Sequence, residues 1–137
     1  MKQVRSEYEP WQVTYLPHGV NHDEFYPIPD DYEQKDKFES FKKQGTMDKE
    51  KDFVVFYNAR NIRRKLPADI IMSYKAFCDT LTKEQADKCM LMMHCTPVDE
   101  NGTDLPQIVK NICPEYDVMF SANKLEREQL NWLYNLA

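Results

Sequence analysis

Four cations lie within six residues of this chain, in the stretch Arg60-Asn-Ile-Arg-Arg-Lys65. A short apolar run, Phe53 to Tyr57, comes shortly before them, and Pro67 follows. Because proline is favoured at the first position of a helix, this order predicts a strand, a basic loop and then a helix. A helix start carries unpaired N–H groups and the positive end of the helix dipole, so added cations favour a phosphate-like anion. The alternative is a solvated basic loop, since the stretch has no Gly-rich phosphate cradle.

Three apolar runs are predicted strands, and a loop that could bind a ligand follows each of them. The first, Phe53 to Tyr57, is continuously apolar, β-branched and aromatic, which favours a strand covered on both faces. The others are Cys89 to Cys95, with methionines as core filler, and Asp117 to Ser121. Ligands of parallel sheets bind beyond the carboxyl ends of the strands. We therefore expect the basic loop, the loop over 96–102 and the stretch Ser121 to Lys124 to hold a nucleotide, with the cations on its diphosphate.

Helical periodicity accounts for most of the remaining chain. Apolar residues recur at 3.6-residue spacing over Pro67 to Leu81, which predicts an amphipathic helix. Further helical patterns cover residues 33–44, 105–112 and 126–137, and residues 82–88 form a turn or a short helix. The alternation of strands and helices predicts an α/β fold, namely a Rossmann-like open parallel sheet with helices on both faces.

The N-terminal part of the chain is predicted to lead into this domain. Trp11 to Leu16 is apolar and β-branched enough for a strand. Gly19 follows that run and a proline, which predicts a turn with positive φ, either an ordinary turn or part of a functional loop. Residues 21–31 contain two prolines and several acids, so an irregular surface link is expected. We divide the chain into 1–51, which holds the junction strand, the link and a short helix, and 52–137, the nucleotide-binding domain.

Composition and charge limit the kinds of partner. With 137 residues, 42% hydrophobic and 30% charged, the chain suits one soluble domain with a substantial core. The net charge is −5 and the cations concentrate in the basic loop, which favours a local anion site and argues against a nucleic-acid surface. The N-terminus lacks a targeting pattern, and no apolar run approaches the roughly 18 residues that span a bilayer. We therefore expect a cytoplasmic protein with no transmembrane segment.

The four cysteines are predicted to be reduced and buried. They fall at irregular spacings inside apolar segments, which is unlike a disulfide framework. Cys89, His94 and Cys95 lie close enough in sequence to raise a metal site as an alternative. Alternation along a strand would put the two thiols on one face and His94 on the other, so we expect no metal and no other cofactor.

Three motifs, in the same order along the chain, resemble the group 1 family of retaining glycosyltransferases, which have the two-domain GT-B fold. The stretch from Tyr15 to Pro27, YLPHGVNHDEFYP, is similar to the family pattern I/L-P-x-G-V-D…F-x-P. The stretch from Asn58 to Lys65, NARNIRRK, resembles G-R-N-x-x-R-K. Val118-Met-Phe120 followed by LNWLYNLA at 130–137 resembles V-x-F…L-x-x-L-Y-x-x-A-D.

The resemblance implies roles for particular residues. The Arg and Lys of the family's basic loop contact the diphosphate of the sugar nucleotide and stabilise the leaving group, and these roles fall on Arg60 and Lys65. Further substrate-binding candidates are Asn61, Arg64, Gly19 and Ser121, the last near the nucleobase. The chain departs from the family at Ala59, where glycine is usual, and at Leu66, where another glycine is frequent.

The resemblance also implies that these residues are only part of an enzyme. The acidic E-x7-E motif of the family, which handles the donor sugar, and the acceptor-binding N-terminal domain are not among the 137 residues. We therefore expect the donor-nucleotide-binding part of the C-terminal half of a GT-B enzyme, which transfers a sugar from a nucleotide diphosphate sugar to an unknown acceptor. On its own this part is expected to be inactive and to self-associate through uncovered sheet. The alternative is a noncatalytic α/β module that binds an anionic ligand or a protein partner.

Overall fold

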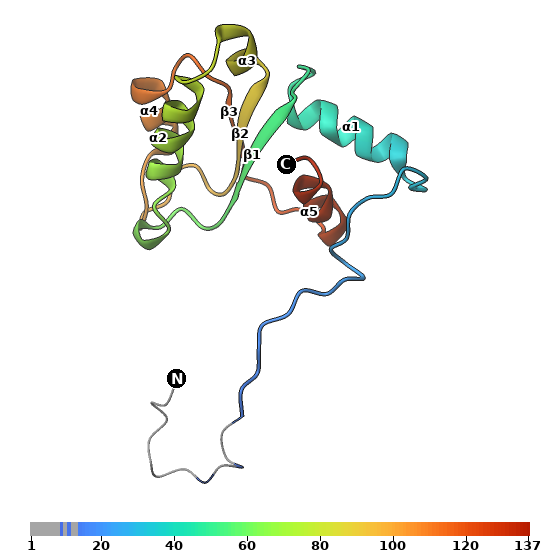
Figure 1. The fold of residues 1–137 in the computed structure, drawn as a ribbon. Coiled ribbons are helices and arrows are strands. Elements are labelled where there is room, and N and C mark those ends of the chain that lie inside the picture. The colour runs from blue at the N-terminus through green and yellow to red at the C-terminus, as the bar shows by residue number, and fades with distance from the viewer. Residues whose placement is uncertain (1–8, 10, 12–13) are drawn as a thin grey trace.

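The chain folds around a small parallel sheet, as Figure 1 shows for the computed structural model, which describes residues 9, 11 and 14–137. Within that part of the chain, helical segments precede and follow each strand. The strands are β1 (Phe53–Asn58), β2 (Cys89–His94) and β3 (Val118–Ser121). The helices are α1 (Lys35–Gly45), α2 (Pro67–Cys78), α3 (Lys83–Asp87), α4 (Leu105–Ile112) and α5 (Arg127–Tyr134), with a 3₁₀ turn, η1 (Arg63–Lys65), between β1 and α2. The prediction of an α/β fold is confirmed.

The sheet is open and parallel, in the order β1-β2-β3. The middle strand, β2, is buried over Cys89 to Met93, whereas β1 lies at one edge and is only partly buried. Val55 and Tyr57 nevertheless pack against the core on the α2 face, and Val54 and Phe56 pack against the core on the face of α1 and α5, so the prediction that β1 is covered on both faces is confirmed for these residues. Its apolar composition is that of an inner strand, but the third strand pairs with β2, which leaves the outer edge of β1 open and Phe53 51% exposed. Self-association through uncovered sheet remains a prediction.

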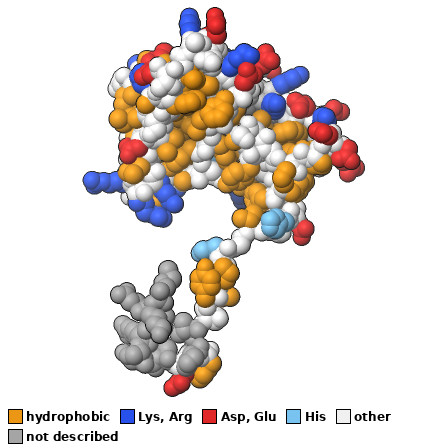
Figure 2. All heavy atoms as spheres, in the orientation of Figure 1, with side chains coloured by type: hydrophobic (Ala, Val, Ile, Leu, Met, Phe, Trp, Pro, Cys, Tyr) orange, Lys and Arg blue, Asp and Glu red, His pale blue; other side chains and the backbone are white. Residues whose placement is uncertain are grey.

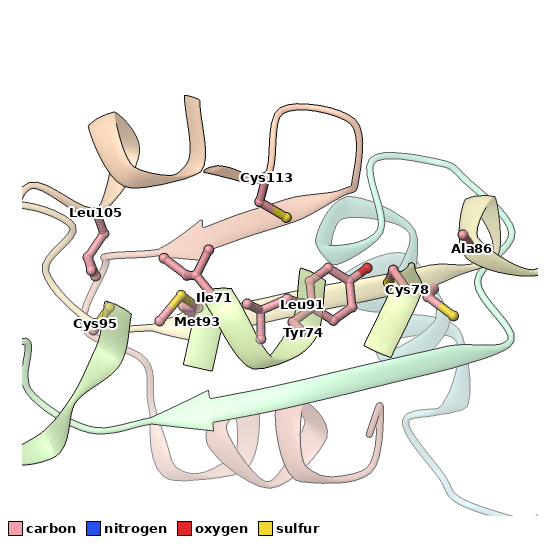
Figure 3. Close-up of a cluster of buried hydrophobic side chains, with 10 residues drawn as sticks. Ile71, Tyr74, Cys78, Ala86, Leu91, Met93, Cys95, Leu105 and Cys113 are labelled. Carbon is pink, nitrogen blue, oxygen red and sulfur yellow. The ribbon is translucent and has the colours of Figure 1, made fainter. Parts of the chain in front are cut away.

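Helices cover both faces of the sheet, as predicted. On one face, Leu91 and Met93 of β2 pack with Ile71 and Tyr74 of α2 and with Leu105 of α4, as Figure 3 shows. The opposite face of β2 packs against α1 and α5, through Met90, Met92, Phe41 and Leu133. The side-chain alternation of one strand thus supplies both halves of the core.

Local signals explain where the helices begin. Pro67 occupies the first turn of α2, as its fixed φ favours. Thr82 and Gln85 form a capping box at the start of α3, and Glu126 and Gln129 form one at the start of α5. These reciprocal bonds pair N–H groups that the first helical turn leaves unsatisfied. The weakly amphipathic helix predicted over 33–44 is confirmed as α1 and ends at Gly45, with Thr46 as its C-cap.

The N-terminal predictions are only partly met. Residues 14–20 form neither helix nor strand, and the side chains of Tyr15 and Leu16 are each 82% exposed. The strand predicted over 11–16 is therefore wrong for Tyr15 and its described neighbours, and residues 12 and 13 lie outside the described part. Strand propensity reflects packing on a pleated surface, and no strand pairs with this segment in the described part of the chain. The positive φ predicted for Gly19 is also wrong, because none of the described glycines has one.

The link over residues 21–31 is irregular, as predicted, but it is attached to α5. The backbone N–H of Tyr26 donates to the side chain of Asn131 at 3.1 Å, and that of Ile28 donates to Asn135 at 2.8 Å. The indole of Trp132 lies with its ring centre 5.3 Å from that of Phe41 in α1. The link and α1 therefore both pack on α5.

The thiols occupy the positions that strand alternation predicts. All four cysteines are buried and free, and Cys89 and Cys95 lie in the core cluster on the α2 face. The ring of His94 instead contacts Ser121 of β3, away from the two thiols. Among the described residues, no group of three His, Cys, Asp or Glu side chains is arranged to hold a metal ion. The helices of that part include none with the length and apolarity needed to cross a membrane.

Candidate functional site

The carboxyl ends of the three strands form one row of polar residues. In the strand register Asn58 pairs with His94, and His94 pairs with Ser121. Neighbouring strands lie about 4.8 Å apart, so the row spans roughly 10 Å. The loops that follow the three strands leave from this shared edge, as the sequence predicted.

The cations of η1 are exposed beside this edge. Arg63, Arg64 and Lys65 are all exposed, and none of the three side chains makes an ion pair with another described residue. Figure 2 shows Lys and Arg side chains gathered below the position that α2 occupies in Figure 1. The turn is tied to β1, because the hydroxyl of Tyr57 donates to the backbone carbonyl of Lys65 at 3.4 Å. The result is a local patch of uncompensated positive charge.

The backbone between η1 and α2 adopts an unusual conformation at Leu66. Its φ is 49° and its ψ is 47°, the left-handed region that glycine enters without steric cost. This is the position at which the family resemblance implies a frequent glycine. No side chain caps the start of α2, and Pro67 has no N–H to offer. The carboxylate of Asp69 already lies in the first turn of α2, where it offsets the positive end of the helix dipole. The positive charge that could attract an anion here therefore comes mostly from the cations of η1.

Arg60 is held by a carboxylate that the sequence did not single out. Its Nε lies 2.9 Å from Oδ2 of Asp99, and its Nη2 lies 3.3 Å from Oδ1. This hydrogen-bonded contact raises the pKa of Arg60 and, together with the backbone N–H of Asn101, lowers the pKa of Asp99. The side chain of Arg60 is still 61% exposed, whereas that of Asp99 is 10% exposed. The only sequence signal was an acid in the loop that follows the next strand.

The buried side chain of Asn61 joins the basic loop to the loop over 96–103. Its side chain is fully buried, and Nδ2 lies 2.7 Å from the carbonyl oxygen of Thr103 and 3.1 Å from that of Pro97. Its Oδ1 accepts the N–H of Thr103 at 3.1 Å. Gly102 packs so closely that a Cβ there would lie 2.2 Å from the backbone oxygen of Asn61. Asn61 was a candidate for substrate contact, but in this structure its polar atoms bind the loop over 96–103.

Ser121 faces the opposite side of the sheet from η1. Its Oγ lies 3.0 Å from Nδ1 of His94, and at the other end of the row Asn58 donates to the hydroxyl of Tyr134 at 2.9 Å. A hollow of about 420 Å³ opens beside Ser121. Its walls come from α1, β2, β3, α5 and the loop between β3 and α5, and include Gln44, Met92, Met119, Asn123, Lys124 and Leu133. The basic loop and the Ser121 loop therefore share an edge but continue onto different faces. Matching the ends of the predicted strands could have revealed the polar row.

Gly19 lies outside this row. It is exposed, and a Cβ added to it would meet nothing within 4 Å. The next residue, Val20, lines an apolar hollow of about 370 Å³ with Phe25 and Tyr134. Because Tyr134 is bonded to Asn58, the segment approaches the carboxyl edge through Val20.

Comparisons with models of protein families, with curated proteins and with solved structures found no match to this chain. The chemistry available at the edge follows from the side chains themselves. A guanidinium held by Asp99, together with three cations that have no ion-pair partner among the described residues, can bind a diphosphate and stabilise negative charge that develops on it.

Proposed function

We propose that this chain binds the diphosphate of a nucleotide sugar at η1, as the donor-binding part of a retaining glycosyltransferase with a Rossmann-like domain and the GT-B fold. The observation that carries the proposal is the cluster of cations where β1 ends and α2 begins, which make no ion pair with any described residue. At the opposite, amino edge of the sheet the lysines are paired: Lys49 and Lys51 with Asp117, and Lys88 with Asp52. Cations left without carboxylates at the ligand-binding edge favour an anionic ligand.

The family resemblance agrees with the local backbone. The motif from Asn58 to Lys65 coincides with the end of β1 and the whole of η1. Leu66, where the family frequently has glycine, adopts a conformation that favours glycine. In this proposal Arg60 and Lys65 bind the diphosphate and stabilise it as a leaving group, with Arg64 beside them. Ser121 would lie toward the nucleobase.

Titration calorimetry with UDP and GDP tests the proposal. Charge-assisted contacts contribute about 1.5–3 kcal/mol each, so Arg60→Ala/Lys65→Ala should bind roughly a hundredfold or more weakly than the unchanged chain. Added salt should weaken binding further, because the cations are exposed. A matched control, Lys83→Ala/Lys110→Ala, removes the same charge from exposed positions in α3 and α4 and should bind normally. Equal binding by the Arg60/Lys65 variant would exclude the assignment.

The same titration separates a nucleotide site from a general anion site. A donor site should bind UDP or GDP more tightly than inorganic pyrophosphate, because the nucleoside adds contacts near Ser121. Equal affinity for all three would favour the noncatalytic anion-binding module instead.

A further inference from the structure

The ion pair between Arg60 and Asp99 points to a role that the basic loop alone does not explain. We propose that Asp99 is a positioning residue, which holds one edge of the Arg60 guanidinium so that its other edge faces the bound diphosphate. This inference rests on the proposed function, because it needs an anion at η1. Asp99 itself would not touch the ligand.

The geometry leaves half of the guanidinium available. Asp99 contacts Nε and Nη2, at 2.9 and 3.3 Å, which is one side of the planar fork. A guanidinium has five N–H donors, so those of Nη1 and the second hydrogen of Nη2 have no partner in the part of the chain that the structure describes. The carboxylate lies inside and the guanidinium outside, as their side-chain exposures of 10% and 61% show. The free donors are therefore on the exposed part, where a phosphate could take two parallel hydrogen bonds.

Asp99 is itself fixed in place, which a positioning residue must be. Its Oδ1 accepts the backbone N–H of Asn101 at 2.9 Å, and its carbonyl oxygen accepts the N–H of Gly102 at 2.9 Å. The loop that carries it is held to the basic loop by the buried amide of Asn61. Arg60 is thus oriented by a rigid partner and loses less rotamer freedom when an anion binds.

Two effects of Asp99 on an anion oppose each other. Its negative charge repels the anion, whereas its contact with Arg60 orients the guanidinium. The anion on the free edge is separated from Asp99 by the guanidinium and is exposed to solvent, so water and salt screen the repulsion. The orienting contact is short, with hydrogen bonds of 2.9 and 3.3 Å, so salt screens it less than it screens the longer-range repulsion. Immobilising one flexible side chain in advance changes affinity by about fivefold. We therefore expect the orienting effect to prevail at 150 mM salt.

A double-mutant cycle with inorganic pyrophosphate as the probe tests the inference. The four proteins are the full chain unchanged, Asp99→Ala, Arg60→Ala and the double variant. Asp99→Ala should weaken pyrophosphate binding about fivefold, but it should have no weakening effect once Arg60 is alanine. Glu100→Ala is the matched control, because it removes the same charge from the same loop while Glu100 has no ion pair with Arg60. That variant should bind pyrophosphate as tightly as the unchanged chain, or slightly more tightly.

NMR relaxation of the Arg60 Nε–H group supplies a readout that a purely structural role would not change. The group should be rigid in the unchanged chain and in Glu100→Ala, and mobile in Asp99→Ala. Asp99→Asn keeps the size of the side chain and serves as a second variant, with an intermediate loss of affinity, should the alanine variant melt early.

The outcomes distinguish the two proposals. Tighter binding by Asp99→Ala, or the same loss in both Arg60 backgrounds, would overturn the role of Asp99 and leave the diphosphate site standing. No binding by the unchanged chain, or full binding by Arg60→Ala, would overturn the proposed function as well.

Discussion

Replacing Asn61 with alanine should destabilise the chain by about 2–4 kcal/mol, a large effect for a residue outside every helix and strand. The side chain is fully buried, and its two amide hydrogens and its carbonyl oxygen are shared among the backbone of Thr96, Pro97 and Thr103. That amounts to about three hydrogen bonds, each contributing about 1 kcal/mol net. Alanine would also leave buried carbonyl groups without a donor, which adds to the cost.

Urea unfolding followed by far-UV circular dichroism measures this change. Asn101→Ala is the matched control, because Asn101 is exposed in the same loop and its amide makes one long contact of 3.4 Å with Glu100. The control should change stability by less than about 0.5 kcal/mol. Gly102→Ala should also destabilise, because its Cβ would meet the Asn61 backbone oxygen at 2.2 Å. If Asn61→Ala lowered the free energy of unfolding by less than about 1 kcal/mol, or by no more than the control does, the reasoning that the Asn61 side chain holds the two loops together would be refuted.

Two further predictions concern the backbone and the thiols. Leu66→Gly should raise the free energy of unfolding by about 0.5–1 kcal/mol, because relief of the strained left-handed conformation outweighs the added entropy of the unfolded chain. Urea unfolding measures this change, and a destabilised variant would contradict the prediction. Burial raises the pKa of Cys95 and Cys113 to about 11, above the ordinary value of 9.0. The stability that comes from these two neutral thiols should therefore be fully present below pH 9 and should fall as the pH rises toward 11. At pH 8 the four thiols should react with Ellman's reagent only after the chain unfolds. Rapid reaction of the folded chain would contradict their burial.

Elements whose pattern repeats over many residues could be predicted from the sequence. The helix starting at Pro67 and the buried strand starting at Cys89 both carry their own periodicity, and the structure places them as expected. The prediction of a strand over 11–16 depended on a distant neighbour and was wrong for the described residues. The apolar run of β1 could not reveal which side of it the third strand would occupy, and the run ending at Leu16 could not reveal whether any strand would pair with it.

The candidate site was predictable in charge but not in geometry. The four cations and the strand before them predicted an anion site, and the structure places these cations at the carboxyl edge, because those features are local in sequence. The partner of Arg60 lies 39 residues further along, in a loop whose fold depends on Asn61 and Gly102. Asn61 can hold the loop over 96–103, and Asp99 can pair with Arg60, only when folding brings the loops after β1 and β2 together.

The buried side chain of Asn61 and the exposed cations of η1 should respond differently to salt. In the proposed function, ligand binding depends on exposed cations, whose attraction for a diphosphate is screened within about 10 Å at 0.1 M salt. The geometry of the two loops depends instead on the neutral amide of Asn61, which is fully buried and which salt does not screen. Salt should therefore weaken binding at η1 while the loops keep their arrangement. Loss of ligand at high salt would reflect the charge of the anion site, and loss of ligand in Asn61 variants would reflect its shape.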